Sequence, residues 1–422
     1  MFRCAEKARP RPWAPLLGVY QRGGHGGMKI LWHSNAPWAK TGYGNQTGLF
    51  WHRIQALGHP VTLSSNYGLQ GAPLDINEHG QSARVLPLGY HSTGNDILAS
   101  HAKQSKADIV ITLYDAWVFD PQVTARFRWC PWLPVDHDPA PPPVVRALRS
   151  AYQPIAYSRF GESRLRDAGL DPRYVPHGID TKVMRPIPQA EARDRVQFPD
   201  QVADYDFLAV MVAANKGEPS RKCFGQVLWA WREFIKSHSK ALLYMHTHAG
   251  QEMHGVNLEE LLVQLDIPAS NVLFADPYWN VLGYPDEYMA HLYSAADVLL
   301  SPSMGEGFGL PIVEAQACGC PVITGNWTSM PELTFAGWTV EGEPFYTPQG
   351  SWQYIPYVRE ILGRLHDAYD ARGAKTLRKK ARAGAVGYDV DYVTDHYWKP
   401  LLEELSAEVA LSSDGELEMV GL

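Results

Sequence analysis

Two glutamates eight positions apart in a glycine-rich segment are the residues of this sequence whose spacing most strongly suggests chemistry. Glu306 stands between two glycines, and Glu314 follows Pro311 within a short apolar stretch. Proline is favoured in the first turn of a helix, so the glycines should form a strand-to-helix loop with free backbone N–H groups. Such groups hold phosphate or hydroxyl oxygens. Carboxylates repel phosphates but accept strong hydrogen bonds from hydroxyls, so the pair favours a polyol ligand. A turn with two solvated glutamates is the alternative interpretation.

Two further motifs could bind ligands, and each has a structural alternative. Gly42-Tyr43-Gly44 joins an apolar run to a helical pattern, but it lacks the third glycine of a dinucleotide fingerprint. Asp136-His137-Asp138 could chelate a divalent ion that holds a diphosphate, because such ions prefer carboxylate oxygens. His137 could equally be a hydrogen-bonded loop residue.

The elements that must position these motifs follow an alternating order. Strands are expected at 28–33, 60–65, 108–113, 129–134, 154–157, 173–175, 206–213, 241–247, 271–274, 297–300 and 321–324, and helices between them, for example at 45–57, 223–237 and 257–265. Several strands are apolar at successive positions, which is typical of parallel strands covered on both faces. The pattern predicts an α/β fold with two doubly wound parallel sheets, whose ligands bind beyond the carboxyl ends of the strands.

A polar, proline-bearing segment divides the alternating pattern into two domains of similar size that face a cleft. We expect a flexible extension over 1–27, a first domain over 28–185, a linker over 186–205 and a second domain over 206–388. A C-terminal helix over 389–407, packing back on the first domain, and a disordered acidic tail over 408–422 complete the prediction. Met28 is an alternative to Met1 as the first residue of the protein.

Composition excludes several classes of protein. The 38 basic and 45 acidic residues give a net charge of −7, which argues against a nucleic-acid coat or a polybasic membrane binder. No apolar run reaches the roughly 18 residues that a membrane span needs. Five scattered cysteines form neither a disulfide framework nor a zinc motif. We therefore expect a cytoplasmic protein.

Residues 293–324 resemble the donor-site signature of family-4 retaining glycosyltransferases. The matching run is Tyr-Ser-Ala-Ala-Asp-Val-Leu-Leu-Ser-Pro-Ser-Met-Gly-Glu-Gly-Phe-Gly-Leu-Pro-Ile-Val-Glu-Ala-Gln-Ala-Cys-Gly-Cys-Pro-Val-Ile-Thr. The resemblance implies the GT-B fold of two Rossmann-like domains, with the acceptor on the first domain and a nucleoside diphosphate sugar on the second. It implies that Glu306 contacts the transferred sugar and Glu314 the ribose. Sugar and phosphate oxygens would lie on the N–H groups of Gly307, Phe308 and Gly309.

Other stretches agree with the same family. The family places an Arg directly after the first strand of the second domain and a Lys about six residues later, both neutralising the diphosphate. Lys222 fits the Lys, whereas Asn215 stands where the Arg is usual, so Arg221 or Lys216 would supply the missing charge. Gly42, Tyr43 and Gly44 resemble the glycine loop of the first domain. The family places His137 at the end of a first-domain strand, facing the donor sugar across the cleft.

These residues predict a metal-independent, retaining hexosyltransferase without a cofactor. His137, Glu306 and Lys222 are the expected catalytic residues, and the donor-binding residues are Gly42, Tyr43, Gly44, Asn215, Arg221, Lys222, Gly307, Phe308, Gly309 and Glu314. The sugar, the base and the acceptor (glycan, lipid, protein or other) stay open. The alternatives are a sugar-nucleotide epimerase or phosphorylase on the same fold, a non-catalytic sugar-nucleotide-binding protein and a dinucleotide-dependent oxidoreductase.

Overall fold

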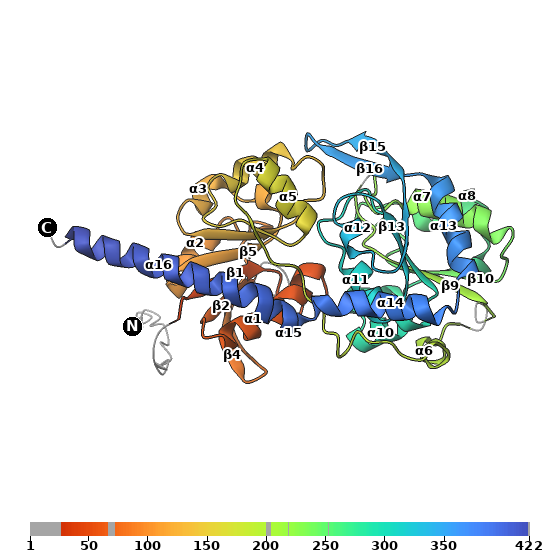
Figure 1. Ribbon diagram of the computed structural model, residues 1–422, viewed down its shortest axis with the longest axis horizontal. Coiled ribbons are helices and arrows are strands. Elements are labelled where there is room, and N and C mark those ends of the chain that lie inside the picture. The colour runs from red at the N-terminus through yellow and green to blue at the C-terminus, as the bar shows by residue number, and fades with distance from the viewer. Residues whose placement is uncertain (1–26, 66–71, 200–203, 218, 252, 421–422) are drawn as a thin grey trace, which may run out of the picture.

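Two parallel β-sheets form the body of the protein in the computed structural model (Figure 1). The structure describes residues 27–65, 72–199, 204–217, 219–251 and 253–420, with side chains up to 412. The extension expected over 1–27 therefore lies almost wholly outside the described residues. The prediction of an α/β architecture with two doubly wound sheets is confirmed.

The first sheet has eight strands in the order β3-β4-β2-β1-β5-β6-β7-β8. All its pairs are parallel except β3 with β4, an antiparallel hairpin that the sequence pattern did not reveal. Its strands are β1 (Ile30–Ser34), β2 (Val61–Ser65), β3 (Leu74–Glu78), β4 (Gln81–Leu86), β5 (Ile109–Leu113), β6 (Trp129–Leu133), β7 (Ile155–Ala156) and β8 (Arg173–Tyr174). Its helices are α1 (Gly42–Ala56), α2 (Leu98–Ser105), η1 (Ala116–Val118), α3 (Pro121–Thr124), α4 (Pro142–Leu148) and α5 (Arg159–Asp167).

The second sheet has six parallel strands in the order β11-β10-β9-β12-β13-β14. Its strands are β9 (Phe207–Val212), β10 (Ala241–His246), β11 (Val272–Phe274), β12 (Val298–Ser301), β13 (Val322–Gly325) and β14 (Gly337–Val340). The helices that accompany it are α7 (Phe224–Ile235), α8 (Leu258–Gln264), η3 (Ala269–Asn271), α9 (Pro277–Leu282), α10 (Asp286–Ala295), α11 (Leu310–Ala317), α12 (Met330–Leu333), α13 (Val358–Asp370) and α14 (Lys375–Ala385). In the sequence, α6 (Gln189–Val196) occupies part of the expected linker, and it packs beside α10 of the second domain.

The chain returns to the first domain at its C-terminal end. The returning elements are η4 (Val386–Tyr388), α15 (Val390–Val393), η5 (Thr394–Trp398) and α16 (Lys399–Val420), which Figure 1 shows passing along the first domain. The buried Trp398 ring lies 5.0 Å from the ring of Trp132 and 5.6 Å from that of Trp32. Arg173 of β8 pairs with Glu404.

The expectation of a disordered tail from residue 408 onward was wrong for the first residues of that segment, which are helical. Helix α16 continues through this region, because Leu402, Leu405 and Val409 recur at helical spacing and are all buried. The acidic residues that suggested disorder, Asp414, Glu416 and Glu418, lie beyond these apolar positions.

Two arginines of the basic helix α14 make hydrogen bonds to backbone carbonyls of other segments. Arg378 donates hydrogen bonds to the carbonyls of Ser294 and Ala296. Arg382 donates to the carbonyls of Met184 and Ala317 and so attaches the segment just before the linker to the second domain. These two arginines serve the packing of the second domain.

Candidate active site

The carboxyl ends of the strands in the two sheets bring together residues from distant parts of the sequence. Strands β5 and β6 of the first sheet lead to Asp115 and to Asp136, and strands β9 and β12 of the second lead to Arg221 and to Glu306. Parallel strands end at the same edge of a sheet, where doubly wound folds bind ligands. The candidate site lies where these two edges meet.

Glu306 is held in the loop between β12 and α11, as expected from its glycines and from Pro311. Its N–H donates to the hydroxyl of Thr328 at 3.1 Å. The Ser329 hydroxyl donates to the carbonyls of Glu306, at 2.8 Å, and of Phe308, at 2.7 Å. Gly309 adopts the left-handed conformation, with φ of 110°, that lets the chain enter α11. Thr328 and Ser329, which the sequence did not single out, thus fix the backbone of the loop.

The carboxylate of Glu306 is buried between two cations. Lys222 Nζ lies 2.5 Å from Glu306 Oε1, and Arg221 Nη1 lies 3.2 Å from Glu306 Oε2. Burial alone would raise the pKa of Glu306, but the charges of Lys222 and Arg221 outweigh it and lower the pKa to about 2. Glu306 is therefore ionised at neutral pH and forms an ion pair with Lys222.

Arg221 and Lys222 lie in the turn directly before α7 rather than within the helix. The N–H of Met304 donates to the carbonyl of Arg221 at 2.8 Å, and the Arg221 guanidinium donates to the carbonyl of Gly305. These bonds attach the cationic turn to the loop that carries Glu306. Burial lowers the pKa of the Lys222 ammonium, while the charge of Glu306 opposes that effect.

Asp136 of the first domain lies near Arg221 and holds the ring of His137. His137 Nδ1 lies 2.7 Å from Asp136 Oδ1, and Asp136 Oδ2 lies 3.8 Å from Arg221 Nη1. Burial would raise the pKa of Asp136, but the hydrogen bond to His137 and the charge of Arg221 hold it below its ordinary value. His137 is 3% exposed, and its ring is oriented by Asp136.

The Asp136-His137-Asp138 motif directs its two carboxylates to different partners. Asp136 faces His137 and Arg221, whereas Asp138 pairs with Arg164 at 2.9 Å. Among the residues that the structure describes, no group of three or more His, Cys, Asp or Glu side chains is placed to hold a metal ion.

Two glycines of the Glu306 loop touch the first domain directly. A side chain at Gly305 would collide with the carbonyl of Asp136, and one at Gly307 would collide with Pro134. Glycine is therefore needed at both positions for close approach of the two domains.

Further contacts join the domains around the site. The hairpin of β15 (Gly342–Tyr346) and β16 (Trp352–Pro356) pairs with the first domain, where Asp138 N–H donates to the Trp352 carbonyl at 3.0 Å. Glu332 accepts hydrogen bonds from the N–H groups of Arg159 and Phe160, both at 3.0 Å. Lys40 pairs with Asp286, also at 3.0 Å.

Glu314 lies on α11, half-buried and away from the cations that hold Glu306. The Tyr293 hydroxyl donates to Glu314 Oε2 at 3.0 Å. Burial raises the pKa of Glu314 to about 7, although the hydrogen bond from Tyr293 opposes that rise. The two glutamates thus have opposite electrostatic environments, which their sequence spacing alone did not reveal.

Both hydrogen-bonding groups of the Asn215 side chain are bonded to the backbone of the protein. Its amide nitrogen donates to the carbonyls of His248, Gly250 and Val256, and its oxygen accepts from the N–H of Val256 at 2.9 Å. Asn215 was expected among the donor-binding residues, but its hydrogen-bonding groups instead fix the loop over 248–256. The cations beside Glu306 are Arg221 and Lys222, which follow this end of β9 in the sequence.

Gly42, Tyr43 and Gly44 begin α1 opposite the start of α11. The Thr41 hydroxyl accepts the N–H of Gly44 at 3.0 Å and caps the helix. A side chain at Gly42 would contact Leu310 of the second domain. The Tyr43 ring packs edge-on against Tyr114, and burial raises the pKa of its hydroxyl. Gly42 therefore lies at the domain interface, and the donor contact expected of the three residues stays a prediction.

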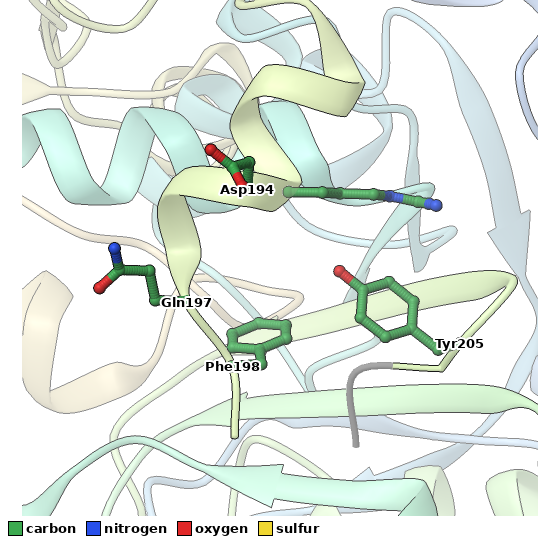
Figure 2. A pocket seen from close by; sticks show the side chains of 5 residues that line it. Asp194, Gln197, Phe198 and Tyr205 are labelled. Atoms are coloured by element: carbon green, nitrogen blue, oxygen red, sulfur yellow. The ribbon is translucent and has the colours of Figure 1, made fainter. Parts of the chain in front are cut away.

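A separate shallow pocket lies on the linker side of the second domain (Figure 2). Its volume is about 260 Å³, and it is lined by Arg193, Asp194, Gln197, Phe198 and Tyr205. The Phe198 and Tyr205 rings lie 6.0 Å apart at its edge. It contains none of the residues predicted to bind the donor.

Solved structures define the class of fold. The chain is similar to sucrose-phosphate synthase from Thermosynechococcus elongatus (TM-score 0.67, 19% identity, 91% of this chain and 100% of that one). It is also similar to HepE from Anabaena in complex with UDP-glucose (TM-score 0.62, 17% identity, 89% of this chain and 99% of that one). The protein has the GT-B fold.

Within this fold, residues 250–351 match the family described as glycosyl transferases group 1. The resemblance to family-4 retaining glycosyltransferases expected from residues 293–324 is thereby confirmed. The enzyme class predicted from the sequence, a hexosyltransferase-type glycosyltransferase, is that of the matched family.

Curated relatives match over shorter segments. O-antigen chain mannosyltransferase B of Escherichia coli is 57% identical over 53 residues, which cover 12% of this chain and 14% of that one. The MMP alpha-(1->4)-mannosyltransferase of Mycolicibacterium hassiacum is 36% identical over 128 residues, or 30% and 28% of the two chains. The D-inositol 3-phosphate glycosyltransferase of Acidothermus cellulolyticus is 27% identical over 151 residues, or 36% and 32%. The chain thus spans less than a third of the length of each of these three relatives.

None of the helices in the described part of the chain is long and apolar enough to cross a membrane.

Proposed function

We propose that the protein transfers a sugar from a nucleoside diphosphate donor to an acceptor, with retention of configuration at the anomeric carbon. The observation that carries this proposal is the buried Glu306 carboxylate, bracketed by Lys222 and Arg221 and facing Asp136 and His137 of the first domain. This arrangement offers cations for a diphosphate and a carboxylate for sugar hydroxyls within one site.

Each group has a role that follows from its charge. As the glycosidic bond breaks, the diphosphate gains negative charge, which Arg221 and Lys222 stabilise. The N–H groups of Gly307, Phe308 and Gly309 hold sugar and phosphate oxygens at the start of α11. The sugar ring becomes oxocarbenium-like and is oriented by Glu306 and His137.

The nucleoside is assigned to the neighbourhood of α11. Glu314 accepts hydrogen bonds from the ribose hydroxyls, for which its ionised form is the better acceptor. Two of the relatives described above carry names of mannosyltransferases, so a mannosyl donor such as GDP-mannose is the first to test, followed by UDP-glucose.

The test is the release of nucleoside diphosphate from these donors by wild-type protein and by Lys222→Ala. If Lys222 acts as a positioned electrostatic group, its removal lowers the rate by about 10²–10³-fold. Lys380→Ala, which removes an exposed lysine of α14, is the matched control. If Lys222→Ala turned over the donor at the rate of the control, Lys222 would have no role in the reaction.

Product analysis separates this function from the alternatives. Formation of an epimerised donor without an acceptor would identify an epimerase, and phosphate-dependent release of sugar 1-phosphate would identify a phosphorylase. Tight donor binding without transfer or hydrolysis would identify a non-catalytic sugar-nucleotide-binding protein.

A further inference from the structure

The hairpin of β15 and β16 continues across the domain boundary by pairing with a residue of the first domain. Asp138 N–H donates to the Trp352 carbonyl at 3.0 Å, and Trp352 N–H donates to the Asp138 carbonyl at 3.3 Å. The Ser351 hydroxyl also donates to the carbonyl of Pro139. Figure 1 shows the hairpin reaching from the second domain toward the first. Both domains therefore contribute to one small sheet at this edge of the molecule.

Tyr346, Trp352 and Asp138 form a row of side chains across this small sheet, called the aromatic row below. Trp352 stands opposite Tyr346 within the hairpin and opposite Asp138 of the first domain. Residues that stand directly opposite each other in antiparallel pairs have their side chains on the same face. The Tyr346 and Trp352 rings pack with their centroids 5.0 Å apart. These two residues are 59% and 42% exposed, so both rings are accessible from solvent.

The opposite face of β16 covers the candidate active site. Successive side chains of a strand point to opposite faces, so Gln353 points away from the face that carries Trp352. The buried Gln353 amide donates to the Asp136 carbonyl at 3.2 Å. Tyr354 N–H donates at 3.0 Å to the carbonyl of Met304, in the loop between β12 and α11. The aromatic row therefore lies on the outer side of the strand whose inner side meets that loop.

An ion pair forms the polar end of the aromatic row. Asp138 Oδ1 lies 2.9 Å from Arg164 Nη1, and both side chains are partly exposed. A carboxylate accepts hydrogen bonds from hydroxyls, and a guanidinium donates them. The C–H groups on one face of a pyranose ring can pack against an aromatic ring while its hydroxyls bond to such polar groups. An acyl chain would remove the ion pair from water without replacing its hydrogen bonds, so the row favours a neutral sugar.

We propose that the aromatic row and Arg164 bind one sugar residue of an oligosaccharide acceptor, beyond the residue that receives the transferred sugar; this rests on the transferase function proposed above. Strand β16 separates the row from the loop that carries Glu306, so a single sugar cannot occupy both places, whereas an oligosaccharide can. The acceptor class is therefore a glycan chain. Residues of both domains contribute, so this subsite exists only while the domains are in contact at the hairpin.

The first test measures glycan binding without any donor. Saturation-transfer NMR titrations with mannotetraose, maltotetraose, cellotetraose and laminaritetraose compare wild-type protein with Trp352→Ala and Trp352→Phe. Tyr346→Ala is a second variant, whose mostly exposed side chain can be removed with little effect on folding. Trp229→Ala, which removes an exposed tryptophan of α7, is the matched control. Thermal shift with GDP and UDP shows that each variant is folded.

We expect wild-type protein and Trp229→Ala to bind at least one of the tetrasaccharides with equal affinity. Trp352→Ala should lose about tenfold in affinity, because the sugar loses its contact with the indole ring, and Tyr346→Ala should also bind more weakly. Trp352→Phe, which keeps an aromatic ring, should recover most of the loss. The proposal would be overturned if wild-type protein bound none of the tetrasaccharides, or if Trp352→Ala and Tyr346→Ala bound them as well as Trp229→Ala does.

The second test measures sugar transfer with GDP-mannose and with UDP-glucose. We expect wild-type protein to have a higher kcat/KM for the tetrasaccharide that it binds than for methyl α-D-mannopyranoside, and this preference should fall about tenfold in Trp352→Ala. An unchanged preference in Trp352→Ala would overturn the acceptor role. Absence of donor turnover with every acceptor would instead overturn the transferase function, and tetrasaccharide binding that still depends on Trp352 would then identify the row as a glycan-binding surface alone.

Discussion

Replacement of Glu306 by Gln tests the electrostatic arrangement of the site without any substrate. The pKa of Glu306 is lowered to about 2 from an ordinary value of 4.5, because the cationic Lys222 and Arg221 outweigh burial. At about 1.4 kcal/mol for each tenfold change in the proton equilibrium, ionised Glu306 stabilises the folded state by about 3 kcal/mol at pH 7. Glu306→Gln leaves both cations without their charged partner and should lose about that amount.

The sign of the pH dependence follows from the lowered pKa. The stabilisation is fully present above pH 4.5, the unfolded value, and is lost as the pH falls toward 2, where the folded protein also takes up the proton. The difference in stability between wild-type and Glu306→Gln should therefore shrink to about 1 kcal/mol at pH 3.

Urea denaturation at pH 7 and at pH 3 measures both differences. Glu259→Gln, which changes an exposed glutamate of α8, serves as the control and should not alter stability at either pH. Equal stability of Glu306→Gln and wild-type protein at pH 7 would refute the electrostatic reasoning, as would a difference that does not change with pH.

Three further predictions concern the neighbouring groups. Burial raises the pKa of Glu314 to about 7, and its ionised form is the better acceptor for ribose hydroxyls. The affinity for free GDP or UDP should therefore rise about tenfold from pH 6 to pH 8. Titration calorimetry should show no such rise for Glu314→Gln. Asn215→Ala should lower the stability by about 1–3 kcal/mol, because backbone groups of the loop over 248–256 lose their partner; an unchanged denaturation midpoint would contradict that role. Gly307→Val should force the loop away from Pro134 and open the domain interface. Small-angle scattering would detect this opening as an increased radius of gyration. An unchanged radius together with full donor turnover would show that the close approach of the two domains is not required.

The sequence predicted the central framework because its signals are local. The apolar run over 207–212 is buried along nearly its whole length, and such a short run is typical of a strand covered on both faces. The glycines and Pro311 around Glu306 likewise restrict the backbone locally, so the loop and the start of α11 followed from residue types alone.

Other features depended on contacts between distant residues and left no local signal. Asp136, for example, faces Arg221, which lies 85 positions further along the chain. Asn215 occupies a position where the family suggested a donor contact, but its partners lie more than thirty residues further on. The hairpin of β15 and β16 is stabilised in part by pairing with Asp138, which no periodicity within the hairpin could indicate.

The return of the chain to the first domain has a consequence for how the protein can be divided. The Trp398 indole, contributed from the far end of the sequence, lies within ring contact of Trp32, Phe50 and Trp132. A fragment that stops at the linker would lack this indole and would expose the large apolar surface that it covers. The first domain is thus discontinuous in sequence, and a separately produced version needs residues 389–412 joined to it or supplied as a peptide.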